Sequence, residues 1–158
     1  VHIYSYLVVM SVSFLAQSAI VSALQLPLFV SKVSAGFPSP AQDYVEQTLD
    51  LNELCIKRPA ATFFVRVEGE SMIDAGIFHN DILVVDRSVN PQHGDIVVAQ
   101  VDSEFTVKEL CLRPQLMLVP RNCAYQPICL ANDNELQIFG VVTNVVRQMS
   151  RAHKSPSP

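Results

Sequence analysis

Between residues 62 and 146 the chain alternates short runs of β-branched and aromatic residues with clusters of turn residues, and few folds are compatible with that pattern. The runs predict strands at residues 62–67, 81–86, 95–101, 104–112, 115–119 and 136–146. Asp102-Ser103 predicts a tight hairpin turn between two of them, and residues 90–94 and 132–134 predict loops. Because 158 residues is the length of one domain, we expect a compact, mostly β fold.

The first 31 residues contain no Asp, Glu, Lys or Arg, and composition leaves three interpretations of this apolar leader open. Residues 1–23 have the length of a transmembrane helix but are rich in Ser. Val33-Ser34-Ala35 imitates the cleavage site of a secretory signal peptide, although no basic residue precedes the apolar part. The third interpretation is an N-terminal arm that docks on the domain or on a partner.

A Pro-rich break separates the leader from the rest of the chain. Gly36-Phe37-Pro38-Ser39-Pro40 excludes helix, because two prolines at alternate positions hold the chain extended. Residues 43–54 then predict a short helix or capped turn. We therefore divide the chain into an N-terminal arm (1–35), a linker with that helix or turn (36–61), a β-rich domain (62–147) and a disordered tail (148–158).

Charge and metal-ligand chemistry exclude several functions. The net charge of −4 argues against a domain that binds nucleic acid through its own basic surface. The four cysteines include no C-x-x-C pair and the four histidines are scattered, so we expect no metal site. The cysteines are Cys55, Cys111, Cys123 and Cys129.

Gly69-Glu70-Ser71-Met72 is a candidate nucleophile turn at the end of the first strong strand. The glycine permits a sharp turn that would expose the Ser71 hydroxyl. A serine nucleophile needs a base, and Lys108 is a candidate if its face of the strand is buried, because burial favours the neutral amine. Alternation places Lys108 on one face with Thr106 and Leu110 but does not say whether that face is buried. An ordinary turn and an exposed strand lysine therefore remain open.

Two His–Asp pairs are alternative candidates for the base. His79 with Asp81 and His93 with Asp95 each lie two residues apart in predicted loops. We rank both pairs below Lys108.

Several blocks of the sequence together resemble the LexA/UmuD family of self-cleaving Ser–Lys peptidases. The first block is residues 67–77 with 80–86, the second is 93–99 with 104–108, and the third is 139–142. Residues 35–41 resemble the cleavage segment of the UmuD-type SOS mutagenesis proteins. The resemblance covers about residues 25–147, and no helix-turn-helix segment precedes the cleavage segment, so it is closer to the UmuD type and its plasmid-borne relatives than to LexA.

The resemblance implies a role for each site residue. Ser71 would be the nucleophile, Lys108 the general base, and the backbone N–H groups of Ser71 and Glu70 the oxyanion hole. The Ala35-Gly36 bond would be cut, with cleavage accelerated by a RecA–single-stranded-DNA filament. On this interpretation the leader is a cytoplasmic arm that the protein removes from itself.

The resemblance also implies a fold and partners. The fold would be the LexA/UmuD-type peptidase domain of short twisted antiparallel strands. The cleaved product would be a homodimer in the bacterial cytoplasm that joins a UmuC-like Y-family polymerase for translesion synthesis. No cofactor, membrane or sequence-specific DNA contact is implied. The alternatives are a non-catalytic adaptor of the same fold and a membrane-anchored Ser–Lys protease similar to signal peptidases.

Overall fold

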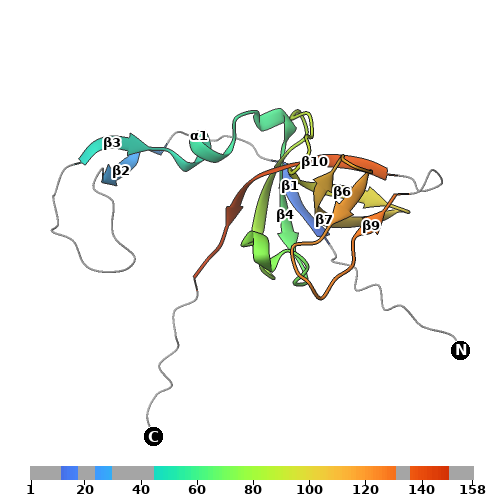
Figure 1. Ribbon diagram of the computed structural model, residues 1–158. Coiled ribbons are helices and arrows are strands. Elements are labelled where there is room, and N and C mark those ends of the chain that lie inside the picture. Colours follow the sequence, from blue (N-terminus) through green and yellow to red (C-terminus); the bar gives the residue numbers. More distant parts are fainter. Residues whose placement is uncertain (1–11, 18–23, 30–44, 131–135, 150–158) are drawn as a thin grey trace, which may run out of the picture.

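The computed structural model describes residues 12–17, 24–29, 45–130 and 136–149, and this part of the chain is mostly β (Figure 1). An eight-stranded antiparallel sheet has the order β1-β4-β5-β10-β6-β7-β8-β9, and β2 and β3 form a separate two-stranded ribbon. Its strands are β1 (Val12–Gln17), β4 (Thr62–Val67), β5 (Ile82–Asp86), β6 (Ile96–Val101), β7 (Glu104–Cys111), β8 (Met117–Val119), β9 (Ile128–Cys129) and β10 (Leu136–Val146). The ribbon is β2 (Leu26–Phe29) and β3 (Val45–Leu49), and the helices are α1 (Leu51–Cys55), η1 (Pro59–Ala61) and η2 (Ile73–Ala75). The predicted fold class is confirmed.

The long strand β10 joins the two halves of the large sheet. Its first half pairs with β6 and its second half with β5, with an irregularity in each register. The change of partner occurs around Gly140, where a Cβ atom would lie 2.7 Å from Val85 Cγ1 and 3.0 Å from the Asp86 carbonyl oxygen. Only glycine permits this close approach between neighbouring strands.

Two apolar clusters form the core. Val65, Val67, Met72, Ile77, Leu83, Val85, Val98 and Val107 make the first; Val97, Ala99, Leu110, Leu118 and Val141 make the second. Strands β6 and β7 contribute to both clusters, so these strands are covered on both faces. Continuous apolar runs such as residues 96–99 are typical of strands buried in this way.

Parts of the leader belong to the β-structure. Strand β1 pairs with the outer edge of β4, and β2 pairs with β3. The Leu24 N–H donates to the Asp50 carboxylate, which also caps the N-terminus of α1 through Asn52 N–H. These contacts tie the start of β2 to α1. None of the helices in the described ranges is long and apolar enough to cross a bilayer.

The predicted elements differ from the observed ones mainly before residue 62. The prediction of a helix or turn over residues 43–54 is wrong for β3 and right for α1. Strands β1, β2 and β9 were not predicted, and β5, β6 and β8 are shorter than expected. The Asp102-Ser103 hairpin turn is confirmed, with φ of 47° and 71°. The predicted loop at 132–134, the cleavage segment and the tail from residue 150 lie outside the described residues.

Candidate active site

The candidate nucleophile lies in a tight turn between β4 and η2. Gly69 adopts a φ of 96°, which lets the chain reverse direction directly after β4. The Gly69 N–H donates to His79 Nδ1 at 3.2 Å. Ser71 is fully buried, and the next residue, Met72, is anchored in the first core cluster. The turn therefore holds the Ser71 side chain against the interior of the domain.

Lys108 lies in the middle of β7 on the face predicted from alternation. Its neighbours on that face are Thr106 and Leu110 along the strand and Val97 across it, and all three are buried. The Lys108 side chain is itself only 5% exposed. Its Nζ lies 2.9 Å from Ser71 Oγ, 2.8 Å from Thr106 Oγ1 and 3.0 Å from the Val107 carbonyl oxygen. The structure thus brings Ser71 and Lys108 together across 37 residues of sequence.

Burial lowers the pKa of the Lys108 amine from 10.5 to about 8. Among the residues that the structure describes, no carboxylate forms an ion pair with it. A neutral amine has two N–H donors and one lone pair. If these donors bind the Val107 carbonyl and the Thr106 hydroxyl, the lone pair faces the Ser71 hydroxyl. The arrangement can therefore accept a proton from that hydroxyl.

A segment that sequence reasoning did not single out closes over the Ser71 turn. Asn122 Nδ2 donates to the Glu70 carbonyl oxygen at 2.9 Å, and the Asp74 N–H donates to the Arg121 carbonyl oxygen at 2.8 Å. The contact between Asn122 and Glu70 spans 52 residues of sequence. Neither residue belongs to a periodic pattern, so the sequence carries no signal for this contact.

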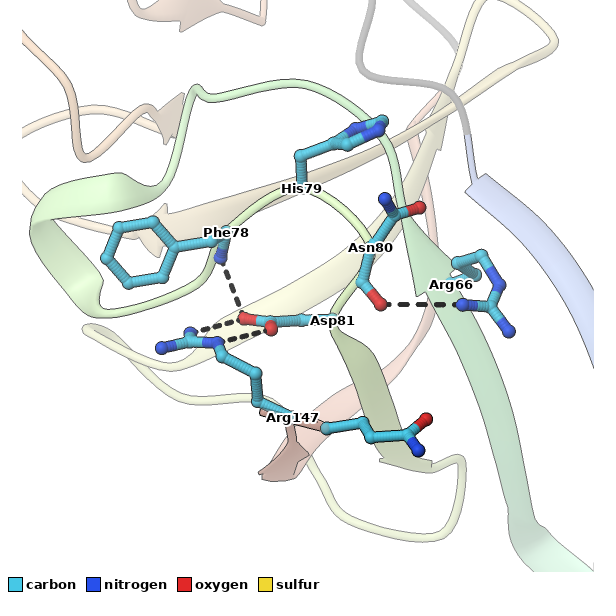
Figure 2. A pocket seen from close by; sticks show the side chains of 7 residues that line it. Arg66, Phe78, His79, Asn80, Asp81 and Arg147 are labelled. Carbon is cyan, nitrogen blue, oxygen red and sulfur yellow. Dashed lines mark hydrogen bonds and ion pairs between the residues drawn. The ribbon is translucent and has the colours of Figure 1, made fainter. Parts of the chain in front are cut away.

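The alternative His–Asp bases are not assembled. His79 accepts the Gly69 N–H, and Figure 2 shows its ring pointing away from the Asp81 carboxylate, which binds Arg147. His93 Nδ1 accepts the Leu112 N–H at 3.0 Å, and the Asp95 carboxylate accepts the Gln92 N–H. Each histidine and aspartate therefore has partners other than its predicted one.

The structure describes only some of the remaining predicted site residues. Glu70 and Ser71, the predicted oxyanion-hole residues, lie in the turn described above, whereas Ala35 and Gly36 lie outside the described residues. Within the described ranges, no group of three or more His, Cys, Asp or Glu side chains is arranged to hold a metal ion.

A mostly β domain with a buried serine beside a lysine of lowered pKa has the construction of a serine peptidase. Comparison with known proteins agrees: the chain belongs to the Peptidase S24-like family, which it matches over residues 27–143. It is 57% identical to Protein ImpA of Escherichia coli over 77% of this chain and 83% of the relative. It is 50% identical to Protein MucA of Escherichia coli over 75% of this chain and 82% of the relative.

A third relative connects the chain to the repressor branch of the family. The LexA repressor of Caldicellulosiruptor saccharolyticus is 41% identical over 81% of this chain and 61% of its own length. ImpA and MucA are UmuD-like SOS mutagenesis proteins, so the predicted resemblance is confirmed. The comparisons place this chain with the UmuD-like SOS mutagenesis proteins among serine peptidases of this family.

Proposed function

We propose that the chain is a self-cleaving serine peptidase in which Ser71 is the nucleophile and Lys108 the general base. The observation that supports this role is the 2.9 Å contact between a buried hydroxyl and a buried amine. A serine hydroxyl is a weak nucleophile until an adjacent base takes its proton. With a pKa of about 8, roughly a tenth of the Lys108 side chains are neutral at pH 7.

The proposed reaction cuts the Ala35-Gly36 bond in two steps. Ser71 Oγ attacks the Ala35 carbonyl carbon while Lys108 takes the hydroxyl proton, and the backbone N–H groups of Ser71 and Glu70 stabilise the oxyanion. The C–N bond then breaks, and the Lys108 ammonium returns its proton to the leaving Gly36 amine. Water, activated by the neutral lysine, hydrolyses the acyl-serine ester and releases a carboxylate at Ala35.

Delivery of the bond to the site is the step that we propose to be regulated. The bond lies in the segment between β2 and β3, and that ribbon stands apart from the large sheet in Figure 1. Cleavage therefore requires the segment to dock beside Ser71. A partner that binds the docked state more tightly raises the rate without changing the chemistry. From the sequence resemblance, we propose that a RecA–single-stranded-DNA filament is that partner.

We propose that the product acts in translesion synthesis in the bacterial cytoplasm. From the resemblance to the UmuD type, we propose a homodimer that joins a UmuC-like Y-family DNA polymerase as an accessory subunit. The net charge of −4 suits a protein that leaves DNA binding to its partners.

Incubation of the purified full chain at pH 10 tests the peptidase role. Deprotonation of Lys108 should allow cleavage without a partner, and mass spectrometry should find fragments that end at Ala35 and begin at Gly36. Ser71→Ala and Lys108→Ala should each abolish the reaction. Lys108→Arg should do so too, because a guanidinium group stays protonated at this pH. An uncut wild-type chain, or cleavage that persists in Ser71→Ala, would contradict the proposal and favour a non-catalytic adaptor.

A further inference from the structure

The side-chain amide of Asn122 is held at both ends by the backbone. Its Oδ1 accepts the Ala124 N–H at 3.0 Å, and its Nδ2 donates to the Glu70 carbonyl oxygen at 2.9 Å. A backbone N–H can only donate and a carbonyl oxygen can only accept. The two partners therefore fix which end of the amide faces Glu70, and that end must be the NH₂ group.

The carbonyl that Asn122 holds belongs to the peptide bond that precedes the candidate nucleophile. The one cis peptide among the described residues is Arg113-Pro114, so the Glu70–Ser71 peptide is trans. In a planar trans peptide the C=O and the N–H point in opposite directions. A hydrogen bond that fixes the Glu70 carbonyl therefore also fixes the direction of the Ser71 N–H.

The segment that carries Asn122 is itself anchored on two sides. It follows β8, which pairs with β7. The Arg121 guanidinium also binds the carboxylate of Glu109, the residue that follows Lys108 in β7, at 2.5 Å. On the other side the Arg121 carbonyl accepts the Asp74 N–H at 2.8 Å. Asn122 is thus held between the strand of the lysine and the turn of the serine.

We propose that Asn122 is a positioning residue for the oxyanion hole. By donating to the Glu70 carbonyl, it holds the Glu70–Ser71 peptide in the orientation in which the Ser71 N–H stabilises the oxyanion. This inference rests on the proposed function, because it assigns Asn122 a part in the same self-cleavage. Asn122 does not touch the scissile bond in this role; it acts through the peptide that does.

The Asn122→Asp variant tests this role with almost no change in shape. The aspartate keeps an acceptor for the Ala124 N–H but places an oxygen against the Glu70 carbonyl, which repels that carbonyl instead of binding it. Cys123→Asp is the matched control, because it adds the same charge at an exposed neighbouring position. Asn122→Ala is a second variant that removes the donor without adding charge.

Self-cleavage of the full chain is measured from pH 6 to pH 11 in wild type and in the three variants. Rates are compared on the alkaline plateau, where Lys108 is neutral in every chain. Loss of one oxyanion donor costs on the order of 10²–10³-fold, so misorientation in Asn122→Asp and Asn122→Ala should lower the plateau rate about 10- to 100-fold. The pH midpoint should move no further in Asn122→Asp than in Cys123→Asp, whose plateau rate should stay within about twofold of wild type.

The possible outcomes separate this role from the proposed function. If both Asn122 variants cleave as fast as wild type on the plateau, the positioning role is wrong and the peptidase role stands. If the midpoint of Asn122→Ala shifts toward 10.5, loss of the side chain has opened the site and hydrated Lys108, and Asn122 is merely structural. If the wild-type chain is not cut at any pH, the proposed function fails and the Asn122 role fails with it.

Discussion

At the scale of single residues, Lys108 combines a stability cost with the proposed chemistry. Burial lowers the pKa of Lys108 from 10.5 to about 8 on folding, and no carboxylate among the described residues forms an ion pair with it. Each unit of pKa corresponds to about 1.4 kcal/mol of free energy, so the ammonium form costs roughly 3 kcal/mol in the folded state. At neutral pH most Lys108 side chains are protonated, so this cost lowers the free energy of unfolding.

The pH dependence of cleavage should report the same group. Only the neutral amine can take the Ser71 proton, so the rate should rise about tenfold per pH unit below 8 and level off above it. First-order rate constants from gel densitometry between pH 6 and pH 11 measure this profile. A midpoint near 6.5 would point instead to a histidine base.

Replacement of Lys108 by Met should stabilise the fold at neutral pH. The unfolded lysine binds its proton up to about pH 10.5 and the folded one only up to about pH 8, so stability rises with pH between these values. The gain at pH 7 is up to roughly 3 kcal/mol in the free energy of unfolding, less the loss of hydrogen bonds to Thr106, and it should vanish near pH 10.5. Urea unfolding of Ser71→Ala chains with and without Lys108→Met measures it without self-cleavage. A variant that is less stable than its parent at pH 7 would contradict the stated cost.

The exposed Arg147 makes a second contact whose stability depends on pH. Its guanidinium binds the buried Asp81 carboxylate at 2.6 Å and lies 4.3 Å from the Phe78 ring centroid (Figure 2). The Arg147 hydrogen bond lowers the pKa of Asp81 below 3.8. The stabilisation is therefore present above about pH 4 and is lost as the pH falls through the lowered pKa.

Arg147→Met keeps the aliphatic stem but removes the guanidinium. We expect a loss of about 1–3 kcal/mol in the free energy of unfolding at pH 7, because the Asp81 carboxylate loses its partner. The loss should shrink below about pH 4, where the variant's Asp81 becomes protonated. Chemical denaturation at pH 7 and pH 3.5 measures both. Arg66 and Arg147 both line the pocket drawn in Figure 2. Arg66→Met is therefore the control, since the exposed Arg66 makes a 3.5 Å contact with the Asn80 carbonyl and, within the described residues, no ion pair.

At the scale of elements, Gly140 permits β10 to change partners. Gly140→Ala places a Cβ 2.7 Å from Val85 Cγ1 and 3.0 Å from the Asp86 carbonyl oxygen, so the strands must move apart. We expect a loss of about 1–3 kcal/mol in thermal or urea unfolding. Gln137→Ala, at an exposed position of the same strand, should cost less than about 1 kcal/mol. Equal losses in the two variants would mean that the strands adjust freely.

The elements that could be predicted from sequence are those with long apolar or β-branched runs. Strands β4, β7 and β10 were predicted with nearly the observed bounds because their runs are bordered by turn residues. Strand β9 has two residues, too few for any periodicity, and β1 lies in a leader whose even mixture of Ser, Ala and apolar residues shows no alternation. Strand β1 pairs with β4, which is about 50 residues away in sequence.

The candidate site was predictable in its residue types and not in its geometry. Alternation placed Lys108 with Thr106, and these side chains are in contact. It could not show that this face is buried, because β7 is covered on both faces by elements from the rest of the chain. The contact between Asn122 and Glu70 could not be predicted either, because it is a single hydrogen bond between loops that are remote in sequence.

At the scale of the whole molecule, the two halves of the large sheet should unfold together. β10 pairs with β5 on one side and β6 on the other, so opening either half exposes an edge of the same strand. Hydrogen exchange followed by mass spectrometry should give similar opening free energies for peptides of β4–β5 and of β6–β7. Gly140→Ala should lower both values by similar amounts. Clearly different values, with only one lowered, would show two independent units.

Strand β10 follows both site residues in the sequence, and this order has a consequence for the newly made protein. Ser71 follows β4 and Lys108 lies in β7, on opposite sides of the place that β10 fills. A nascent chain that has emerged from the ribosome only as far as residue 130 contains both side chains but lacks the strand that joins the two halves of the sheet. The Ser71–Lys108 pair would therefore form only after β10 has been made, and a chain that still lacks β10 would be protected from cutting itself during translation.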